Sequence, residues 1–211
     1  MDFNNMLSYV ENILKQNDAL KPHKENQCFR NRYEHSLRVY KWAKKLAIDY
    51  PNINLDICLT ACIFHDVGYA YGQDNHPINS VKIFKKYANE MNFDSKFVEI
   101  VSNIINVHSD KSLLKDPNSS PELIILLEAD LMDEEGALGI VWDLFSEGMN
   151  KPDSFDCGLE TLNKHSAHIL NQDYMVTPLA KKIWNEKKEL VKDFILQLKE
   201  DLFYKELILW I

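Results

Sequence analysis

Glycine and proline are scarce in this chain, with 6 and 7 occurrences in 211 residues. Segments that alternate strictly between apolar and polar residues, the pattern of a half-buried strand, are nearly absent. Apolar residues instead recur at every third or fourth position, which is the spacing of amphipathic helices. The two absences argue against a β fold, and the periodicity favours an all-α one.

Cysteine is also sparse, with Cys28, Cys58, Cys62 and Cys157 the only four. The first residues, "MDFNNMLSYV", lack the basic and long apolar regions of a secretory signal. No apolar run approaches the roughly 18 residues needed to span a bilayer. We therefore expect reduced thiols, a cytoplasmic location and no membrane partner.

Positive charge is in deficit, and the formal net charge is −8. This balance argues against non-specific binding to nucleic acid or to an anionic membrane. It does not exclude a small anionic substrate, because a bound metal ion can reverse the local field. Hydrophobic residues make up 45% of the chain and charged residues 27%, as in ordinary soluble globular proteins.

The periodicity predicts one all-α domain over residues 1–211 with seven to nine helices. Asp56 is expected to cap a helix that ends near Val67, with Gly68 as its stop. The stretch "NKPDSFDCG" (150–158) is expected to be a polar loop. We expect the core of the fold at about 30–145 and a helical C-terminal layer at about 150–211. The predicted helices cover 3–16, 33–50, 56–67, 95–109, 121–132 and 134–148, and two more begin at Pro77 and Thr177.

Several metal-ligand residue types interrupt these apolar helical faces. His65 and Asp66 directly follow the apolar run "ACIF", Asp130 lies within "LIILLEADLM", and His35 and His108 share apolar stripes. Taken singly, each also fits a hydrogen-bonded core histidine or a capped, salt-bridged carboxylate. Together, on the inner faces of four helices, they favour a divalent metal, which accepts imidazole and carboxylate ligands and cancels buried negative charge.

A second metal pattern is weaker. Cys58, Cys62 and His65 stand at i, i+4 and i+7, which could form one face of a zinc site. The lack of a fourth ligand and the apolar surroundings favour two buried thiols instead. His165 and His168 lie outside the constellation, on a predicted helix, and are expected to be structural.

The order His…His-Asp…Asp resembles the signature of the HD superfamily of metal-dependent phosphohydrolases. The matching stretches are "YEHSLRV", "ACIFHDVG" and "LLEADLMD", and the resemblance runs from about Arg32 to Leu144. "EADLMDEEGALGI" is similar to the D-A-D-x-L-D-x-x-G-A segment of small stand-alone bacterial HD hydrolases, with Glu128 in place of the first Asp. The C-terminal extension of that subgroup is also helical.

The resemblance implies that one metal is held by four ligands: His35, His65, Asp66 and Asp130. His76 in "DNHPINS" and His108 in "NVHSD" stand where HD proteins supply either ligands for a second metal or contacts to substrate phosphate. His76 also fits a plain loop residue near a helix N-terminus.

The resemblance also suggests catalytic and substrate-binding roles around the metal. Asp66 would orient or deprotonate the attacking water, and Asp133 would bond a metal-held water or else cap the next helix. Three cations are candidates for holding phosphate oxygens, although each also fits a solvated surface charge: Arg32, Arg38 and Lys111.

The implied activity is hydrolysis of a phosphoester or phosphoanhydride bond, with a nucleoside di- or triphosphate as the expected substrate. One or two ions of Mn, Fe, Co, Ni or Zn would activate the water and polarise a phosphoryl oxygen. The stretch "NVHSDKS" lacks the His-His-Glu and Gly-Tyr-Pro motifs of the subgroup that cleaves cyclic dinucleotides, so a cyclic dinucleotide is disfavoured as the substrate. The alternatives are an HD-fold diiron oxygenase and a non-catalytic nucleotide-binding sensor. A homodimer is common among small helical hydrolases, but no residue here specifies one.

Overall fold

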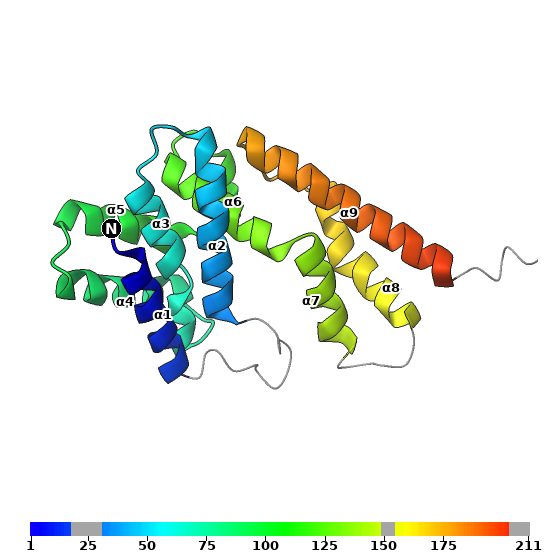
Figure 1. Ribbon diagram of the computed structural model, residues 1–211, viewed down its shortest axis with the longest axis horizontal. Helices are drawn as coiled ribbons and strands as arrows, with labels where there is room; N and C mark the ends of the chain where they lie inside the picture. Colours follow the sequence, from blue (N-terminus) through cyan, green and yellow to red (C-terminus); the bar gives the residue numbers. More distant parts are fainter. Residues whose placement is uncertain (18–30, 149–154, 203–211) are drawn as a thin grey trace, which may run out of the picture.

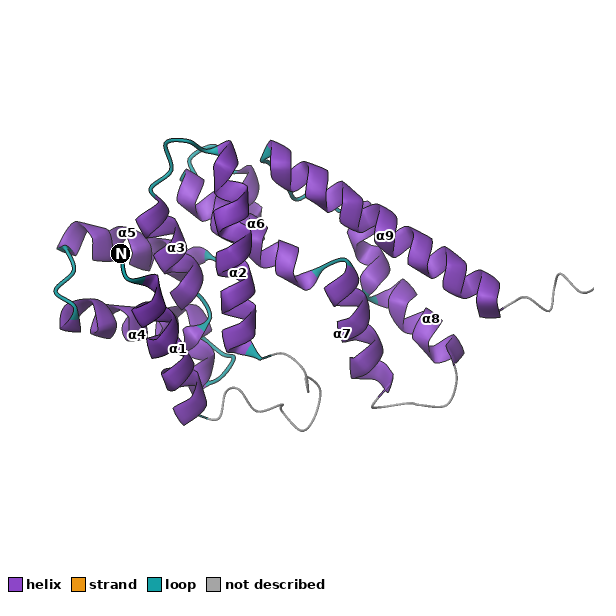
Figure 2. Ribbon diagram, viewed as in Figure 1, coloured by secondary structure: helices purple, strands orange, loops and turns teal. Residues whose placement is uncertain are grey.

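Helices form every regular element that the structure describes. The structure is a computed structural model, and it describes residues 1–17, 31–148 and 155–202. Within these ranges there is no strand (Figure 2), so the all-α prediction is confirmed. No helix in the same ranges is long and apolar enough to cross a membrane. The α-helices are α1 (Phe3–Gln16), α2 (Arg32–Leu46), α3 (Leu55–Phe64), α4 (His76–Glu90), α5 (Ser95–Val107), α6 (Pro121–Glu134), α7 (Ala137–Gly148), α8 (Phe155–Lys164) and α9 (Pro178–Leu202).

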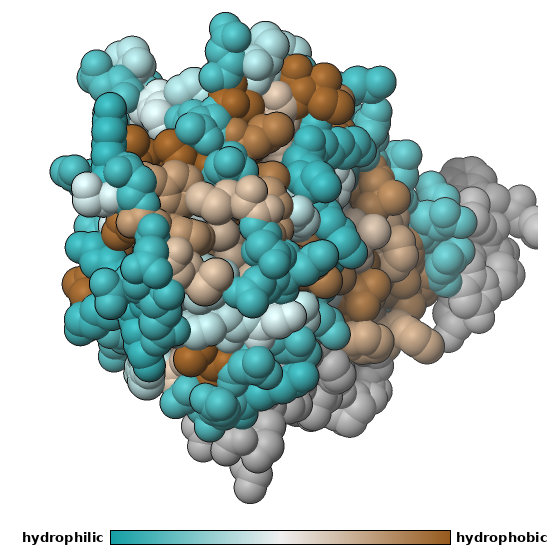
Figure 3. Space-filling model, turned by 60° about the vertical axis from the view of Figure 1, so that its left-hand side comes forward, coloured by the Kyte–Doolittle hydropathy of each residue, from teal (hydrophilic) through white to brown (hydrophobic). Residues whose placement is uncertain are grey.

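Four short 3₁₀ helices lie among these elements: η1 (Ala47–Asp49), η2 (Val67–Tyr71), η3 (Lys111–Lys115) and η4 (Ser166–Asn171). The helices α1–α6 pack as one group around α3, in which every residue from Ile57 to Phe64 is buried. A helix that is apolar all round belongs in the centre of a core. Polar side chains cover much of the face seen in Figure 3, with apolar groups between them. Figure 1 shows α6 leading out of this group towards α7, α8 and α9.

The two ends of α3 differ from the sequence prediction. Asn54, not Asp56, caps the helix, because the Asn54 side chain accepts a hydrogen bond from the Ile57 amide. Asp56 lies in the first turn, where its negative charge interacts favourably with the helix dipole and still stabilises the helix. The helix ends at Phe64 instead of Val67, and after His65 and Asp66 the chain tightens into η2.

Gly68 allows the turn after α3 to lie against the start of α4. A Cβ atom at Gly68 would lie 2.0 Å from the His76 carbonyl oxygen and 2.6 Å from the Ser80 nitrogen. The Gly68 amide donates to Ser80 Oγ at 2.8 Å, and Ser80 Oγ donates to the His65 carbonyl at 2.6 Å. The His65–Asp66 turn is therefore tied directly to α4.

Part of the expected polar loop at 150–158 is helical. Helix α8 starts at Phe155, so the second half of the expected polar loop is helical, and residues 149–154 lie outside the described residues. Glu128, which is fully buried on α6, anchors the start of α9 to the core. Its carboxylate accepts hydrogen bonds from the Val176 amide (2.6 Å), the Thr177 amide (2.8 Å) and Thr177 Oγ1 (2.7 Å). Burial nevertheless raises the pKa of Glu128.

Candidate metal centre

Six imidazole and carboxylate side chains from five parts of the chain form one cluster beside the N-terminal half of α2. They are His35, His65, Asp66, His76, His108 and Asp130. All are buried except His76, which is partly exposed. Two groups of three have donor atoms within 4.8 Å of one another: His35 with His65 and Asp66, and Asp66 with His76 and His108. Asp66 belongs to both groups, so one carboxylate could serve two neighbouring ions.

The first group, with Asp130 beside it, contains the four residues that the sequence suggested for one metal. His35 Nε2 lies 3.2 Å from His65 Nε2, 3.1 Å from Asp130 Oδ1 and 3.4 Å from Asp66 Oδ2. His65 Nε2 lies 3.7 Å from Asp130 Oδ1. The expected convergence of the three chain segments is thus present in the structure.

The second group shows that His76 is not a plain loop residue. It is the first residue of α4, and its Nε2 lies 3.4 Å from Asp66 Oδ1 and 3.3 Å from His108 Nε2. His108 Nε2 is itself 3.3 Å from Asp66 Oδ1. This arrangement allows either a second cation or the phosphoryl group of a substrate beside Asp66.

Backbone carbonyls fix the tautomer of three of the four imidazoles. The Nδ1 atoms of His65, His76 and His108 lie 2.8, 3.2 and 2.6 Å from the carbonyl oxygens of Cys62, Gln73 and Ile105. A carbonyl can only accept, so each Nδ1 must carry the hydrogen. In the neutral ring the Nε2 lone pair is then free to bind a cation, and all three Nε2 atoms point to the centre of the cluster.

The protonation states also fit a cation. Burial favours the neutral form of Asp66, but the nearby His65, His108, His35 and Arg32 outweigh it and hold the Asp66 pKa well below its usual value. Burial likewise opposes the charge on Asp130, and Lys111, His35 and His65 lower its pKa. Burial lowers the pKa of His65 and of His76. Ionised carboxylates and neutral imidazoles are the forms that bind divalent metals.

His35 differs because a carboxylate, not a carbonyl, faces its Nδ1. Asp133 Oδ2 lies 2.7 Å away. Burial opposes protonation of His35, yet the hydrogen bonds to Asp130 and Asp133 outweigh it and raise the pKa. Arg38 donates to both oxygens of Asp133, at 2.6 and 3.0 Å. Asp133 therefore orients His35; it neither caps the next helix nor reaches the centre of the cluster itself.

We expect Asp133→Asn to weaken metal binding by about 10- to 100-fold, the usual cost of losing a carboxylate behind a histidine ligand. The reason is that an amide holds the His35 Nδ1–H less strongly and makes the ring less basic. Competition between the protein and a chelator for Mn²⁺ would measure the affinity. Asp56→Asn, an exposed carboxylate on α3, is the control, and equal affinities of the two variants would contradict the role of Asp133.

The three candidate cations are all engaged with carboxylates. Arg32 Nη1 donates to Asp66 Oδ2 at 2.8 Å, and Lys111 Nζ donates to Asp130 Oδ2 at 2.5 Å. Both thus lie beside the cluster instead of being solvated surface charges. Arg38 contacts Asp133, one side chain further out.

Tyr69 is a residue of the site that the sequence analysis missed. Its ring stacks on His76 with centroids 4.3 Å apart, and the Arg32 guanidinium lies 3.5 Å from the centroid of the same ring. The available signal was its position, three residues after Asp66 in the short segment that leads to His76. Tyr69 holds one imidazole and one cation of the site in place.

The alternative zinc face is not formed. Cys58 and Cys62 are buried, and Cys58 Sγ points to the Glu122 carbonyl at 3.8 Å. Burial raises the pKa of Cys62 well above its usual value, which keeps it a thiol. His168 pairs with Glu135 at 2.9 Å, away from the cluster.

The comparisons with known proteins agree with this geometry. Residues 32–135 match the family model of the HD domain. No match was found among curated proteins.

Solved bacterial structures share the fold across nearly the whole chain. The Lin1889 protein of Listeria innocua is 21% identical with a TM-score of 0.63, and the alignment covers 96% of this chain and 98% of that one. An HD-superfamily hydrolase of Bacillus thuringiensis is 20% identical with a TM-score of 0.68, covering 94% and 95%. Bacillus subtilis YpgQ in complex with ADP is 20% identical with a TM-score of 0.61, covering 93% and 96%. With its His…His-Asp…Asp residues gathered at one point, the chain belongs to the HD superfamily, and residues 32–135 are its HD domain.

Proposed function

We propose that this protein is a metal-dependent phosphohydrolase. The observation that carries the proposal is the set of Nε2 atoms and carboxylate oxygens aimed at one buried point, with three imidazoles locked by backbone carbonyls as ligand-ready tautomers. When bound there, a divalent ion would lower the pKa of a water molecule and polarise a phosphoryl oxygen.

The surrounding residues have separate tasks in this proposal. Four side chains hold the first ion: His35, His65, Asp66 and Asp130. Asp66 is also the group best placed to accept a proton from the attacking water, because its Oδ1 faces the second half of the cluster. Arg32 and Lys111 lie beside Asp66 and Asp130, where their positive charge would stabilise the phosphoryl oxygens of the substrate.

The proposed substrate is a nucleotide. Support comes from YpgQ, a protein of the same fold that was crystallised with ADP. Mixed nitrogen and oxygen donors suit Mn, Fe, Co, Ni or Zn, and the shared Asp66 suits either one ion or two.

The test is release of phosphate or pyrophosphate from a panel of nucleoside di- and triphosphates by the metal-stripped protein before and after Mn²⁺ is added. We expect turnover only with metal, and the product identifies the bond that is cleaved. If metal binds at the cluster but no nucleotide is hydrolysed, the proposal is wrong. Visible-light absorption of the iron-loaded protein would then point to an oxygenase, and nucleotide binding without turnover to a sensor.

A further inference from the structure

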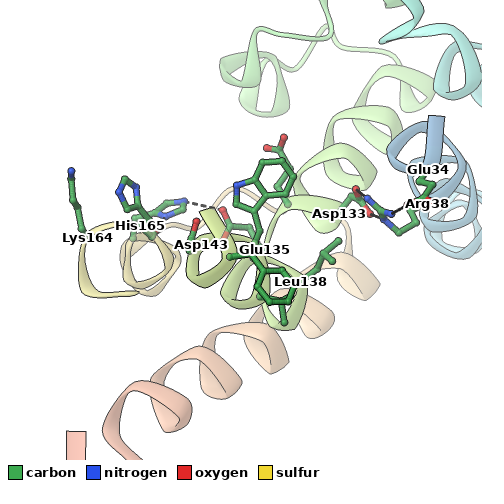
Figure 4. A pocket seen from close by; sticks show the side chains of 14 residues that line it. Glu34, Arg38, Asp133, Glu135, Leu138, Asp143, Lys164 and His165 are labelled. Carbon is green, nitrogen blue, oxygen red and sulfur yellow. Dashed lines mark hydrogen bonds and ion pairs between the residues drawn. The ribbon is translucent and has the colours of Figure 1, made fainter. Parts of the chain in front are cut away.

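A cavity of about 450 Å³ lies beside the candidate metal centre, between α2, the end of α6, α7 and η4. Figure 4 shows Arg38 and Asp133 at one side of it and Lys164 and His165 at the other, with Leu138 and Asp143 between them. Its volume falls within the range of about 300–1,000 Å³ that is usual for small-molecule sites.

The α7 wall of the cavity is apolar and exposed. Leu138, Val141 and Phe145 are 39%, 46% and 53% exposed, and Trp142 lies among them. Two aromatic side chains and two aliphatic ones on a single helix face offer a surface for a flat ring, because every aromatic ring has a face that can stack.

The polar part of the lining carries a negative balance. It holds five carboxylates and two permanent cations. Arg38 is paired with Asp133 at 2.6 Å and His168 lies 2.9 Å from Glu135, so three carboxylates and Lys164 remain outside these pairs. Carboxylates accept hydrogen bonds and repel phosphates. The cavity therefore favours a ring that carries N–H donors and disfavours the charged end of a phosphorylated molecule.

Asp133 and the first turn of α2 connect the cavity to the metal centre. Asp133 lines the cavity and contacts His35 Nδ1 at 2.7 Å. In the first turn of α2, Arg32 contacts Asp66 and Glu34 faces the cavity. The Arg32 end of this region is positively charged and suits phosphates. The cavity end carries the carboxylates and suits a ring with N–H donors.

We propose that the cavity binds the base of the substrate, and that this base is a nucleobase with an exocyclic amino group, such as adenine. The ring lies against Phe145 and Trp142, and the amino group donates to a carboxylate of the lining. The phosphates lie at the metal centre, on the Arg32 side. This inference rests on the proposed function, since it names the substrate class of that site.

The first experiment measures binding without hydrolysis. Adenosine is titrated by calorimetry into the full-length, metal-stripped protein, and purine riboside, which lacks the amino group, is compared. We expect saturable adenosine binding that competes with ATP, weaker binding of purine riboside, and a loss of about tenfold or more in Phe145→Ala. Phe194→Ala, an exposed phenylalanine on α9 outside the cavity lining, is the matched control.

The second experiment measures specificity. Inorganic tripolyphosphate offers the same type of bond as ATP without a base, so we expect the ratio of kcat/KM for ATP to that for tripolyphosphate to fall about tenfold in Phe145→Ala. No saturable adenosine binding, adenosine that fails to compete with ATP, or an unchanged ratio would overturn the assignment of the cavity. Failure to release phosphate or pyrophosphate from either compound, with adenosine binding intact, would overturn the hydrolase function and leave the nucleoside site standing.

Discussion

Asp66→Ala should abolish both metal binding and the release of phosphate or pyrophosphate from nucleotides. Asp66 is the only residue in both donor groups. Its Oδ2 lies 3.4 Å from His35 Nε2, and its Oδ1 lies 3.7, 3.4 and 3.3 Å from the Nε2 atoms of His65, His76 and His108. Its removal takes a ligand from both positions and leaves four imidazoles and Arg32 crowded around a reduced negative charge. We expect turnover to fall by at least about 10³-fold, since the metal supplies several kcal/mol of transition-state stabilisation.

Metal content and the release of phosphate or pyrophosphate should be measured on the same preparations, with circular dichroism to check the helices. Asp56→Ala removes an exposed carboxylate from the start of α3, the helix that precedes Asp66, and should behave as the wild type. A variant at Asp66 that keeps full metal content and turnover would show that the centre lies elsewhere.

Glu128→Ala should destabilise the fold more than any single change at the surface. The substitution leaves two amides and one hydroxyl at Val176 and Thr177 without their acceptor in a buried place. Each such loss costs about 1–3 kcal/mol, so we expect a decrease of about 3 kcal/mol or more in the free energy of unfolding. For a chain of this size that corresponds to a fall of roughly 6–12 °C in Tm.

Urea denaturation followed by circular dichroism would measure the change. Glu128→Gln keeps the size and one acceptor oxygen, so it should lie between the wild type and the alanine variant. Glu99→Ala, at an exposed position of α5, should stay within about 0.5 kcal/mol of the wild type. Equal stability of Glu128→Ala and Glu99→Ala would refute the anchoring role.

The helical period explains why much of the candidate centre was predictable. A histidine or carboxylate on an otherwise apolar helix face must point inward, so His35 and Asp130 could be placed facing the core before any contact was known. The pairing of atoms could not be predicted. That Asp66 turns one oxygen to His35 and the other to His108 depends on how α2, α4 and α5 sit against one another.

The features that the sequence did not predict also depend on local backbone geometry or on contacts between distant parts of the chain. Asn54 and Asp56 are both good capping residues, and only the local backbone decides that Asn54 takes the cap. Glu128 was noticed as a departure from the similar family segment, but its partners lie 48 and 49 positions further along the chain. Tyr69 has no pattern of its own, because its role arises from two neighbours on different helices.

Gly68 has a consequence for how such a centre can change during evolution. Because the turn that carries Asp66 touches α4 backbone to backbone, no larger residue fits at this position without pushing α4 outward. This main-chain contact sets the shortest distance between the Asp66 turn and the start of α4, and the Ser80 hydroxyl bonds the two segments together. A shift in metal preference would therefore have to come from rotating or exchanging imidazoles and carboxylates, because the backbone of the Asp66 turn cannot move closer to α4.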